Sequence, residues 1–256
     1  MSRVTVAGGS ITEIIYALGL EGSLVAVDRT SNFPAAAREL PSVGYVRNLS
    51  VEGLMSLNPT LILGEDDMGP PPVMRQLKAT RIELRQLGED HTADGIIAKV
   101  RCVATIMNAA AKGEAFIQQT LMPTVEALAT LKASGRRTVL LFGLRDGAPM
   151  VGGANTSAHG LISMAGGANV FGQIKGWKPV SLEAMAKADP EVIVMPERGV
   201  RAAGGVDKVL AHPAVRLTTA ARNNSVVTMD GMSMLGFGPR TLKSALMLAE
   251  QLRELP

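Results

Sequence analysis

Short runs of Val, Ile and Leu recur along the chain and alternate with stretches whose apolar residues follow helical spacing. The short runs predict buried strands, and the helical spacing predicts amphipathic helices. Strands that alternate with helices are typical of parallel sheets covered by helices. The predicted strands are residues 4–7, 24–27, 61–63, 81–84, 138–142, 191–195 and 226–229.

One long stretch between the two groups of strands, from about residue 92 to 132, has helical spacing and no strand signal. A helix of ~25 to 30 residues is ~40 Å long, which is enough to join two lobes. Pro123 should kink or restart it, because an interior proline removes a backbone donor. We predict an N-terminal lobe (1–91), an interlobe helix (92–133) and a C-terminal lobe (134–256). The expected fold class is α/β, with two Rossmann-like lobes of mostly parallel sheet joined by a long helical spine.

An internal repeat supports two similar lobes, since residues 50–63 match residues 181–194. Each copy has a serine able to cap a helix, then a glutamate in the first turn, Glu52 or Glu183. An Asn-Pro or Asp-Pro pair then stops the helix, and an aliphatic strand follows. Matching βα units in both halves are the economical interpretation.

The repeat also predicts where a ligand binds. The segment before each capping serine runs from the carboxyl end of a strand into a helix, the edge at which open α/β sheets bind ligands. Tyr45 then aligns with Gly176 and Arg47 with Lys178, beside the chain's one tryptophan, Trp177. Tyr45 and Arg47 would line one side of the ligand site, and Trp177 and Lys178 the other. These side chains suit a flat, anionic, partly apolar ligand. The alternative for Trp177 is packing on the lobe surface.

Composition narrows the class of protein. With 46% hydrophobic residues, a net charge of +3 and 3% aromatics, the chain is expected to be globular and not to bind nucleic acid. No apolar stretch reaches the ~18 to 20 residues of a membrane span. The N-terminus lacks a signal peptide, which leaves open that one was removed. The single cysteine, Cys102, forms no intrachain disulfide and is expected to be a small buried residue.

Two motifs point to a known family. The sequence around Gly44-Tyr45-Val46-Arg47, with Leu235-Gly236-Phe237-Gly238-Pro239-Arg240, resembles the periplasmic haem-binding proteins of bacterial haem-import ABC transporters. The resemblance covers almost the whole chain and implies a monomer in the periplasm that binds haem. It implies that Tyr45 is the axial ligand of the haem iron. It also implies that Glu52 and Glu183 dock onto arginines of a permease dimer in the inner membrane.

The chemistry of the tyrosine agrees with this implication. A free phenol has a pKa of about 10, so a phenolate ligand at neutral pH needs the iron and a nearby cation. Arg47 points the same way along an extended segment and is able to supply that charge. Tyrosinate is an established haem ligand. The alternative is a tyrosine of the rim or the core.

Other residues are candidates to contact the propionates and the porphyrin ring of the haem. The resemblance offers Arg240 for the propionates, and Lys178 and Arg29 are weaker candidates. Met234 and Phe237, with Met232 and Leu235, either contact the porphyrin or pack in the local core.

A second axial ligand would be sought among the histidines. His159 and His91 are candidates, His212 looks peripheral, and lone histidines are usually structural. Whether one or two haems bind stays open.

The predicted function is therefore capture of ferric haem and delivery to an ABC permease, without catalysis. The first alternative is a corrinoid or ferric-siderophore carrier of the same fold, which would not need Tyr45 as a metal ligand. A haem-acting α/β enzyme is disfavoured, because the sequence has no recognisable nucleophile and base. A metal-ion carrier would need a convergent His/Asp/Glu cluster.

Overall fold

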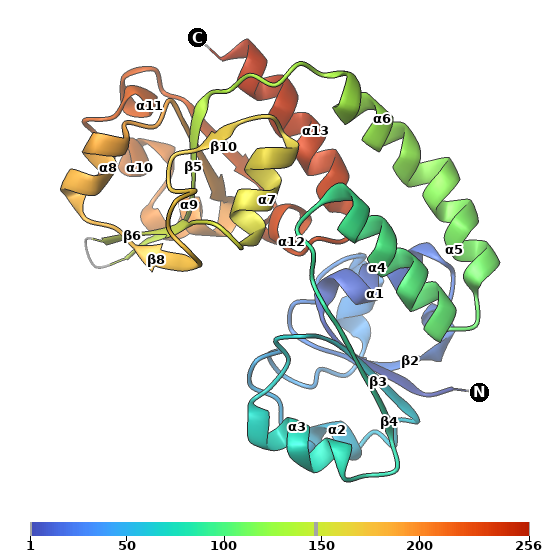
Figure 1. Ribbon diagram of the computed structural model, residues 1–256. Helices are drawn as coiled ribbons and strands as arrows, with labels where there is room; N and C mark the ends of the chain where they lie inside the picture. The colour runs from blue at the N-terminus through green and yellow to red at the C-terminus, as the bar shows by residue number, and fades with distance from the viewer. Residues whose placement is uncertain (1, 146–147, 256) are drawn as a thin grey trace. The chain divides into compact units, whose positions relative to one another are not determined.

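The computed structural model describes residues 2–145 and 148–255, and Figure 1 shows them as a ribbon. The chain divides into two compact units, each with a sheet of its own. The first unit comprises Met1–Asp90 and Asp94–Met122, and the second comprises His91–Ala93 and Pro123–Pro256. The predicted α/β class with mostly parallel sheets is confirmed.

The sheet of the first unit is parallel, with the order β2-β1-β3-β4. Strands β1 and β3 are almost entirely buried, which is why most of their residues are apolar. Strand β4 begins at Glu83 rather than at residue 81, because this edge strand buries only Leu87 fully and leaves a weak apolar pattern. The strands are β1 (Val4–Ala7), β2 (Leu24–Val27), β3 (Leu61–Glu65) and β4 (Glu83–Leu87).

Helices cover both faces of this sheet. Figure 1 shows α1 and α4 on one side, and α2 and α3 on the other. Under α2 and α3, Ala26 and Ile62 of the strands pack with Leu54 and Leu77 of the helices. The helical segments are α1 (Gly9–Ala17), η1 (Glu21–Ser23), η2 (Ala35–Glu39), α2 (Val51–Met55), α3 (Pro71–Lys78), α4 (Ala93–Ile106) and α5 (Ala110–Phe116).

The stretch expected to form one interlobe helix is broken after α4. Asn108 has a left-handed φ of 53°, which ends the helix, and the chain starts again as α5. The two helices pack closely, as the space around Gly113 shows. A Cβ at this position would lie only 2.5 Å from the Cβ of Ala104. The prediction of a single helix from residue 92 is therefore wrong, and the first part is a helical hairpin.

The second part of the stretch is a continuous helical run in which Pro123 disturbs the regular pattern, as predicted. A π-helical turn, η3 (Ile117–Leu121), directly precedes Pro123 in α6 (Met122–Thr130). Proline crowds the turn before it, and the wider π turn relieves that crowding. The boundary between the units falls at Pro123, inside this run, so α4 and α5 belong to the first unit and α6 to the second.

The sheet of the second unit has the order β10-β9-β5-β6-β8, and β7 also pairs with β5. Pairing is parallel among β10, β9, β5 and β7 and antiparallel from β5 to β6 and β8. The antiparallel strands were missed because Pro149 and Pro179 interrupt their apolar pattern. The strands are β5 (Arg137–Arg145), β6 (Ala148–Gly152), β7 (Ala168–Asn169), β8 (Trp177–Pro179), β9 (Val192–Pro196) and β10 (Val226–Met229).

Two apolar cores lie on opposite sides of the buried strand β9, because alternate residues point to opposite faces. Val192 and Val194 pack into one core, and Ile193 and Met195 into the other. The remaining helices are α7 (Ser157–Met164), α8 (Leu182–Ala188), α9 (Glu197–Ala203), α10 (Val206–Ala211), α11 (Thr219–Arg222), α12 (Gly231–Leu235) and α13 (Pro239–Glu254).

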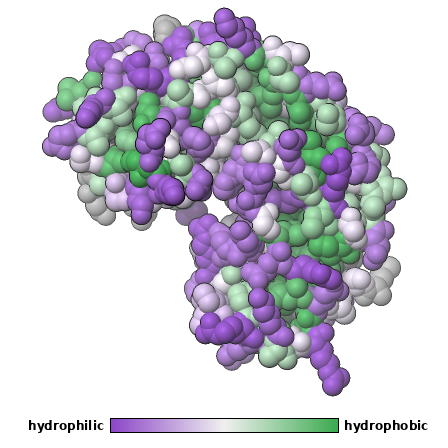
Figure 2. All heavy atoms as spheres, in the orientation of Figure 1, coloured by the Kyte–Doolittle hydropathy of each residue, from purple (hydrophilic) through white to green (hydrophobic). Residues whose placement is uncertain are grey.

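The face seen in Figure 2 mixes hydrophilic and hydrophobic residues over both units. Of the helices in the described part of the chain, none is both long enough and apolar enough to cross a membrane.

Candidate functional site

Tyr45 and Arg47 lie on a tight turn that presents both side chains to solvent. The Asn48 N–H donates to the Tyr45 carbonyl at 2.7 Å, which closes the turn. Gly44 enters it with a φ of 94°, a conformation that favours glycine. Val46 is buried, whereas Tyr45 is 39% exposed and Arg47 is exposed. The chain turns here and does not run extended as predicted, and Tyr45 and Arg47 are exposed on either side of the buried Val46.

Backbone hydrogen bonds hold this turn at the carboxyl end of the parallel sheet. The Arg29 N–H, just after β2, donates to the Gly44 carbonyl at 2.7 Å. Gly69, in the loop after β3, donates to the Val46 carbonyl at 2.9 Å and accepts from the Leu49 N–H at 2.8 Å. Carboxyl ends of parallel strands are where open α/β sheets bind ligands, so this is the location expected from the sequence.

The polar contact at the turn joins three side chains. Arg47 Nη1 donates to Tyr45 Oη at 3.0 Å, and Arg47 Nε donates to Asp67 Oδ2 at 2.6 Å. Partial burial lowers the pKa of Arg47, but the hydrogen bond and charge of Asp67, with a smaller contribution from Tyr45, outweigh this and raise it. The guanidinium therefore places a positive charge and a hydrogen-bond donor beside an exposed phenol oxygen.

Asp67 is a residue whose role at this site the sequence did not reveal. The Asp66-Asp67 pair before a Gly-Pro run is typical of a solvated turn. Its position after the buried strand β3 was the available signal, because β3 ends at the same edge of the sheet as β2.

In the second unit, Trp177 and Lys178 lie on edge strand β8. Gly152 of β6 pairs with Trp177 in the antiparallel register. The half-buried indole meets Phe142 edge to face at 5.6 Å, and Phe142 is 57% exposed. Lys178 is exposed. Phe142 was missed as a surface residue because it ends an apolar strand and reads as core.

Arg240 is already engaged in an ion pair. Its Nη1 lies 3.1 Å from Asp230 Oδ1, and its side chain is 24% exposed. Asp230 also caps α12 by accepting from the Ser233 N–H. The exposed Arg29 side chain is placed near the Tyr45 turn by its backbone bond to Gly44.

Met234 and Phe237 are buried completely in the second unit. Met234 belongs to the core beside β10, and the Phe237 ring meets the His91 ring edge to face at 4.8 Å. The expected contact of these two side chains with a porphyrin is therefore wrong, and local core packing is correct. Apolar residues in a short helix look alike from the sequence whether they point inward or outward.

The histidines make contacts typical of structural residues. His159 is half-buried on α7, and its Nδ1 lies 3.3 Å from Asn169 Nδ2. The Asn169 amide also donates to the Gly152 carbonyl and accepts from the Phe171 N–H, which fixes its orientation. His159 Nδ1 therefore accepts a hydrogen bond from the Asn169 amide, which is a structural contact, and a role of His159 as an iron ligand stays a prediction.

His212 has a local structural contact of the same kind. Its Nδ1 accepts from the Ala214 N–H at 3.2 Å, after the end of α10. The peripheral position expected for His212 relative to the ligand site stays a prediction.

The repeated serine caps form as predicted. Ser50 accepts from the Gly53 N–H at 3.0 Å, and Ser181 accepts from the Ala184 N–H at 3.1 Å. Both first-turn glutamates, Glu52 and Glu183, are exposed. Hydrogen bonds from the Ser181 side chain and the Glu183 backbone lower the pKa of Glu183, so its carboxylate is ionised at neutral pH.

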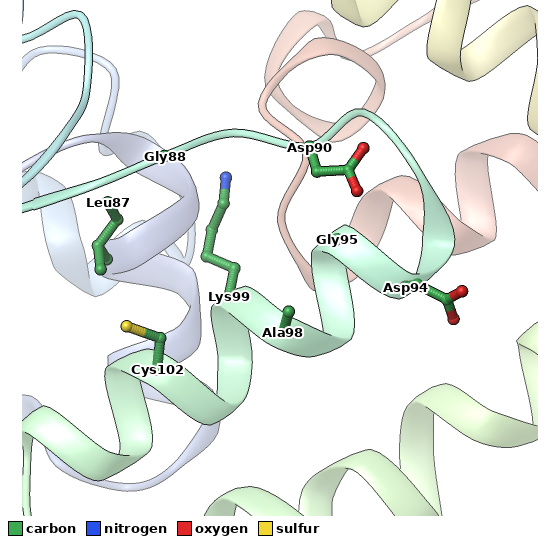
Figure 3. A pocket seen from close by; sticks show the side chains of 8 residues that line it. All are labelled: Leu87, Gly88, Asp90, Asp94, Gly95, Ala98, Lys99 and Cys102. Carbon is green, nitrogen blue, oxygen red and sulfur yellow. The ribbon is translucent and has the colours of Figure 1, made fainter.

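A groove of about 350 Å³ lies in the first unit between α4 and the segment after β4. Figure 3 shows the Cys102 sulfur directed toward Leu87, and the Asp90 and Asp94 carboxylates at the other end. Cys102 is exposed, so the prediction that it is buried is wrong. The buried stripe of α4 includes Lys99 instead. The groove is lined by Leu87, Gly88, Asp90, Asp94, Gly95, Ala98, Lys99 and Cys102.

Lys99 belongs to a polar cluster in the interior of the first unit. Its Nζ lies 2.8 Å from Glu89 Oε1 and 3.2 Å from Ser10 Oγ, and Ser10 Oγ donates to Glu65 Oε1 at 2.8 Å. Burial is the main cause that raises the pKa of Glu65 from 4.5 to about 7, and the Glu89 charge adds to it. Lys99 and the Ser10 hydroxyl act in the opposite direction.

We expect this carboxyl group to make stability depend on pH. Between pH 4.5 and 7 the folded state binds more protons at Glu65 than the unfolded state, so the unfolding free energy falls as the pH rises. Glu65→Gln should make this decrease in unfolding free energy between pH 4.5 and 7 smaller by about 2 kcal/mol. Urea unfolding at a series of pH values measures it. The exposed variant Glu39→Gln is the control, and an unchanged pH dependence in Glu65→Gln would contradict the prediction.

Comparison with known proteins places these features in a family. The family profile described as "Periplasmic binding protein" matches residues 4–232. The structure is similar to that of the periplasmic haem-binding protein BhuT in complex with two haems. Identity is 32% and the TM-score 0.93, over 99% of this chain and 98% of that one. RhuT, the periplasmic haem-binding protein of Roseiflexus sp. RS-1, solved in apo form, has 31% identity and a TM-score of 0.91 over the same shares.

Another relative is named for a different ligand. The vitamin B12-binding protein of Pectobacterium atrosepticum is 26% identical over 99% of this chain and 89% of that protein. The family profile covers residues 4–232 of 256, from the first strand to the start of α12. The chain belongs to the periplasmic binding protein family.

Proposed function

We propose that this protein binds ferric haem through the Tyr45 phenolate and delivers it to an ABC import permease from the periplasm. The observation that carries the proposal is the hydrogen bond of 3.0 Å from Arg47 to the exposed Tyr45 oxygen. A lone surface tyrosine would be a poor anion at neutral pH, and a neighbouring guanidinium stabilises the charged form. Haem supplies the iron that completes this stabilisation.

The relatives support haem over other ligands of the same family. Proteins that are 31–32% identical to this chain and share its fold are named as haem-binding. The vitamin B12-binding relative is less similar, at 26% identity. A corrinoid carrier would leave the Tyr45–Arg47 pair without a metal to bind.

Basic and aromatic side chains fit the remainder of a haem. Arg29 and Lys178 are exposed cations able to meet the propionates. Phe142 and Trp177 offer an aromatic surface to a flat ring. That this surface faces Tyr45, and that Arg240 joins the propionate contacts, remain predictions.

A titration of the apo protein with ferric haem tests the proposal. We expect saturation at one or two equivalents, with a visible spectrum typical of a ferric, phenolate-ligated haem. Calorimetry with cyanocobalamin and with a ferric hydroxamate siderophore serves as the comparison. Binding of either of these without binding of haem would refute the proposal and favour the corrinoid or siderophore alternative.

A further inference from the structure

We propose that Asp67 is a positioning residue that holds the Arg47 guanidinium against the Tyr45 phenol oxygen. The inference rests on the proposed haem function. Asp67 Oδ2 lies 2.6 Å from Arg47 Nε and 2.5 Å from Arg47 Nη2. Both contacts use one edge of the planar guanidinium, which leaves Nη1 for Tyr45 Oη at 3.0 Å. A single carboxylate oxygen thereby fixes the direction in which the third nitrogen donates.

Arg47 needs such an anchor because little else restrains it. Its side chain is 62% exposed, and an arginine in water samples many rotamers. A guanidinium that is held before the ligand arrives loses less freedom when the phenolate forms. Its guanidinium carbon lies 6.0 Å from the centre of the Tyr45 ring, at the outer limit of a cation–π contact, so the ring itself provides a weak restraint.

The backbone that carries Asp67 is well placed to act as an anchor. The next residue, Met68, is 4% exposed, and its N–H donates to the Glu65 carbonyl at 3.0 Å. Gly69 then exchanges hydrogen bonds with both Val46 and Leu49 of the Tyr45 turn. The loop after β3 and the turn that carries Tyr45 and Arg47 are therefore joined by backbone contacts, and Asp67 spans the same pair of segments through its side chain.

Two effects of Asp67 oppose each other. Its negative charge partly neutralises Arg47 and so weakens the support for a phenolate, whereas its hydrogen bonds keep the guanidinium in place. Asp67 is 37% exposed and Arg47 more so, and water screens charges at such sites strongly. Positioning should therefore outweigh the loss of charge.

The decisive comparison is Asp67→Asn against Asp66→Asn. Asp66 is the exposed neighbour, so both variants remove one negative charge from the same loop. We expect Asp67→Asn to speed haem dissociation about five- to tenfold, as loss of one pre-ordered side chain predicts. It should also shift the phenolate-to-iron charge-transfer band. Asp66→Asn should leave both close to wild type, and Asp67→Glu should restore part of the loss.

A measurement on the apo protein makes the test independent of haem. The Arg47 Nε–H should give a slowly exchanging signal in the nitrogen–proton NMR spectrum of wild type and Asp66→Asn, and lose it in Asp67→Asn. If Asp67→Asn and Asp66→Asn have equal effects, loss of one negative charge explains both. That result would overturn the inference that Asp67 positions Arg47. An unprotected Arg47 Nε–H in wild type would overturn it as well. Failure of wild type to bind haem would refute the proposed function, and the apo spectrum would still decide whether Asp67 holds Arg47.

Discussion

Tyr45→Phe is expected to weaken haem binding by at least about 100-fold and to abolish the phenolate-to-iron charge-transfer band. The substitution removes only the oxygen that would bind the iron and keeps the ring. Loss of an outer-sphere partner of a metal ligand already costs about 10- to 100-fold in affinity, so loss of the ligand itself should cost more. Titration of the variant with ferric haem, followed in the visible range, measures both effects.

The chain provides a matched control for this experiment, because it contains two tyrosines. Tyr16 lies on α1, where burial and the nearby Glu21 raise the pKa of its phenol, which disfavours a phenolate. Tyr16→Phe should therefore bind haem as wild type does. A normal spectrum in Tyr45→Phe, or its loss in Tyr16→Phe, would show that Tyr45 is not the ligand.

Reversal of charge at both Glu52 and Glu183 is expected to reduce haem import at least about tenfold while haem affinity stays unchanged. Each glutamate is exposed in the first turn of a serine-capped helix, one in each unit. Replacement by arginine would set like charges against the arginines expected on the permease, and such contacts cost several kcal/mol. Haem-dependent growth of the source bacterium, deleted for this protein and complemented with each variant, measures import.

The control is Glu250→Arg, which makes the same charge change at an exposed position of α13. Each single reversal should have a smaller effect than the double one, because one docking contact remains. Normal import by the double variant would refute the docking role. A parallel loss of haem affinity would instead assign the two glutamates to the ligand site.

Features with a strong local cause were predictable from the sequence. The strand β1 was found because a strand buried on both faces is mostly apolar, and three of its four residues are. The serine caps were found because residues 50–63 and 181–194 repeat the same signals, and two independent copies support each other. Exposure of Tyr45 was expected from the glycine before it and the arginine two residues later, although the segment forms a turn and not the extended run that was predicted.

Features that depend on tertiary packing were not predictable in the same way. The burial of Met234 and Phe237 is set by neighbours from distant parts of the chain, His91 among them. The break after α4 depends on Asn108 in a left-handed conformation, which many asparagines never adopt. Asp67 acquires its role only because the loop after β3 folds onto the Tyr45 turn.

The exposed Cys102 thiol on α4 limits which disulfide-linked species form when this protein is oxidised. Cys102 is the one cysteine in 256 residues, so any disulfide it forms must be with another molecule. The periplasm is an oxidising compartment in which protein disulfides form and persist. Covalent linkage between copies of this chain would therefore stop at the dimer, since neither copy retains a thiol for a third.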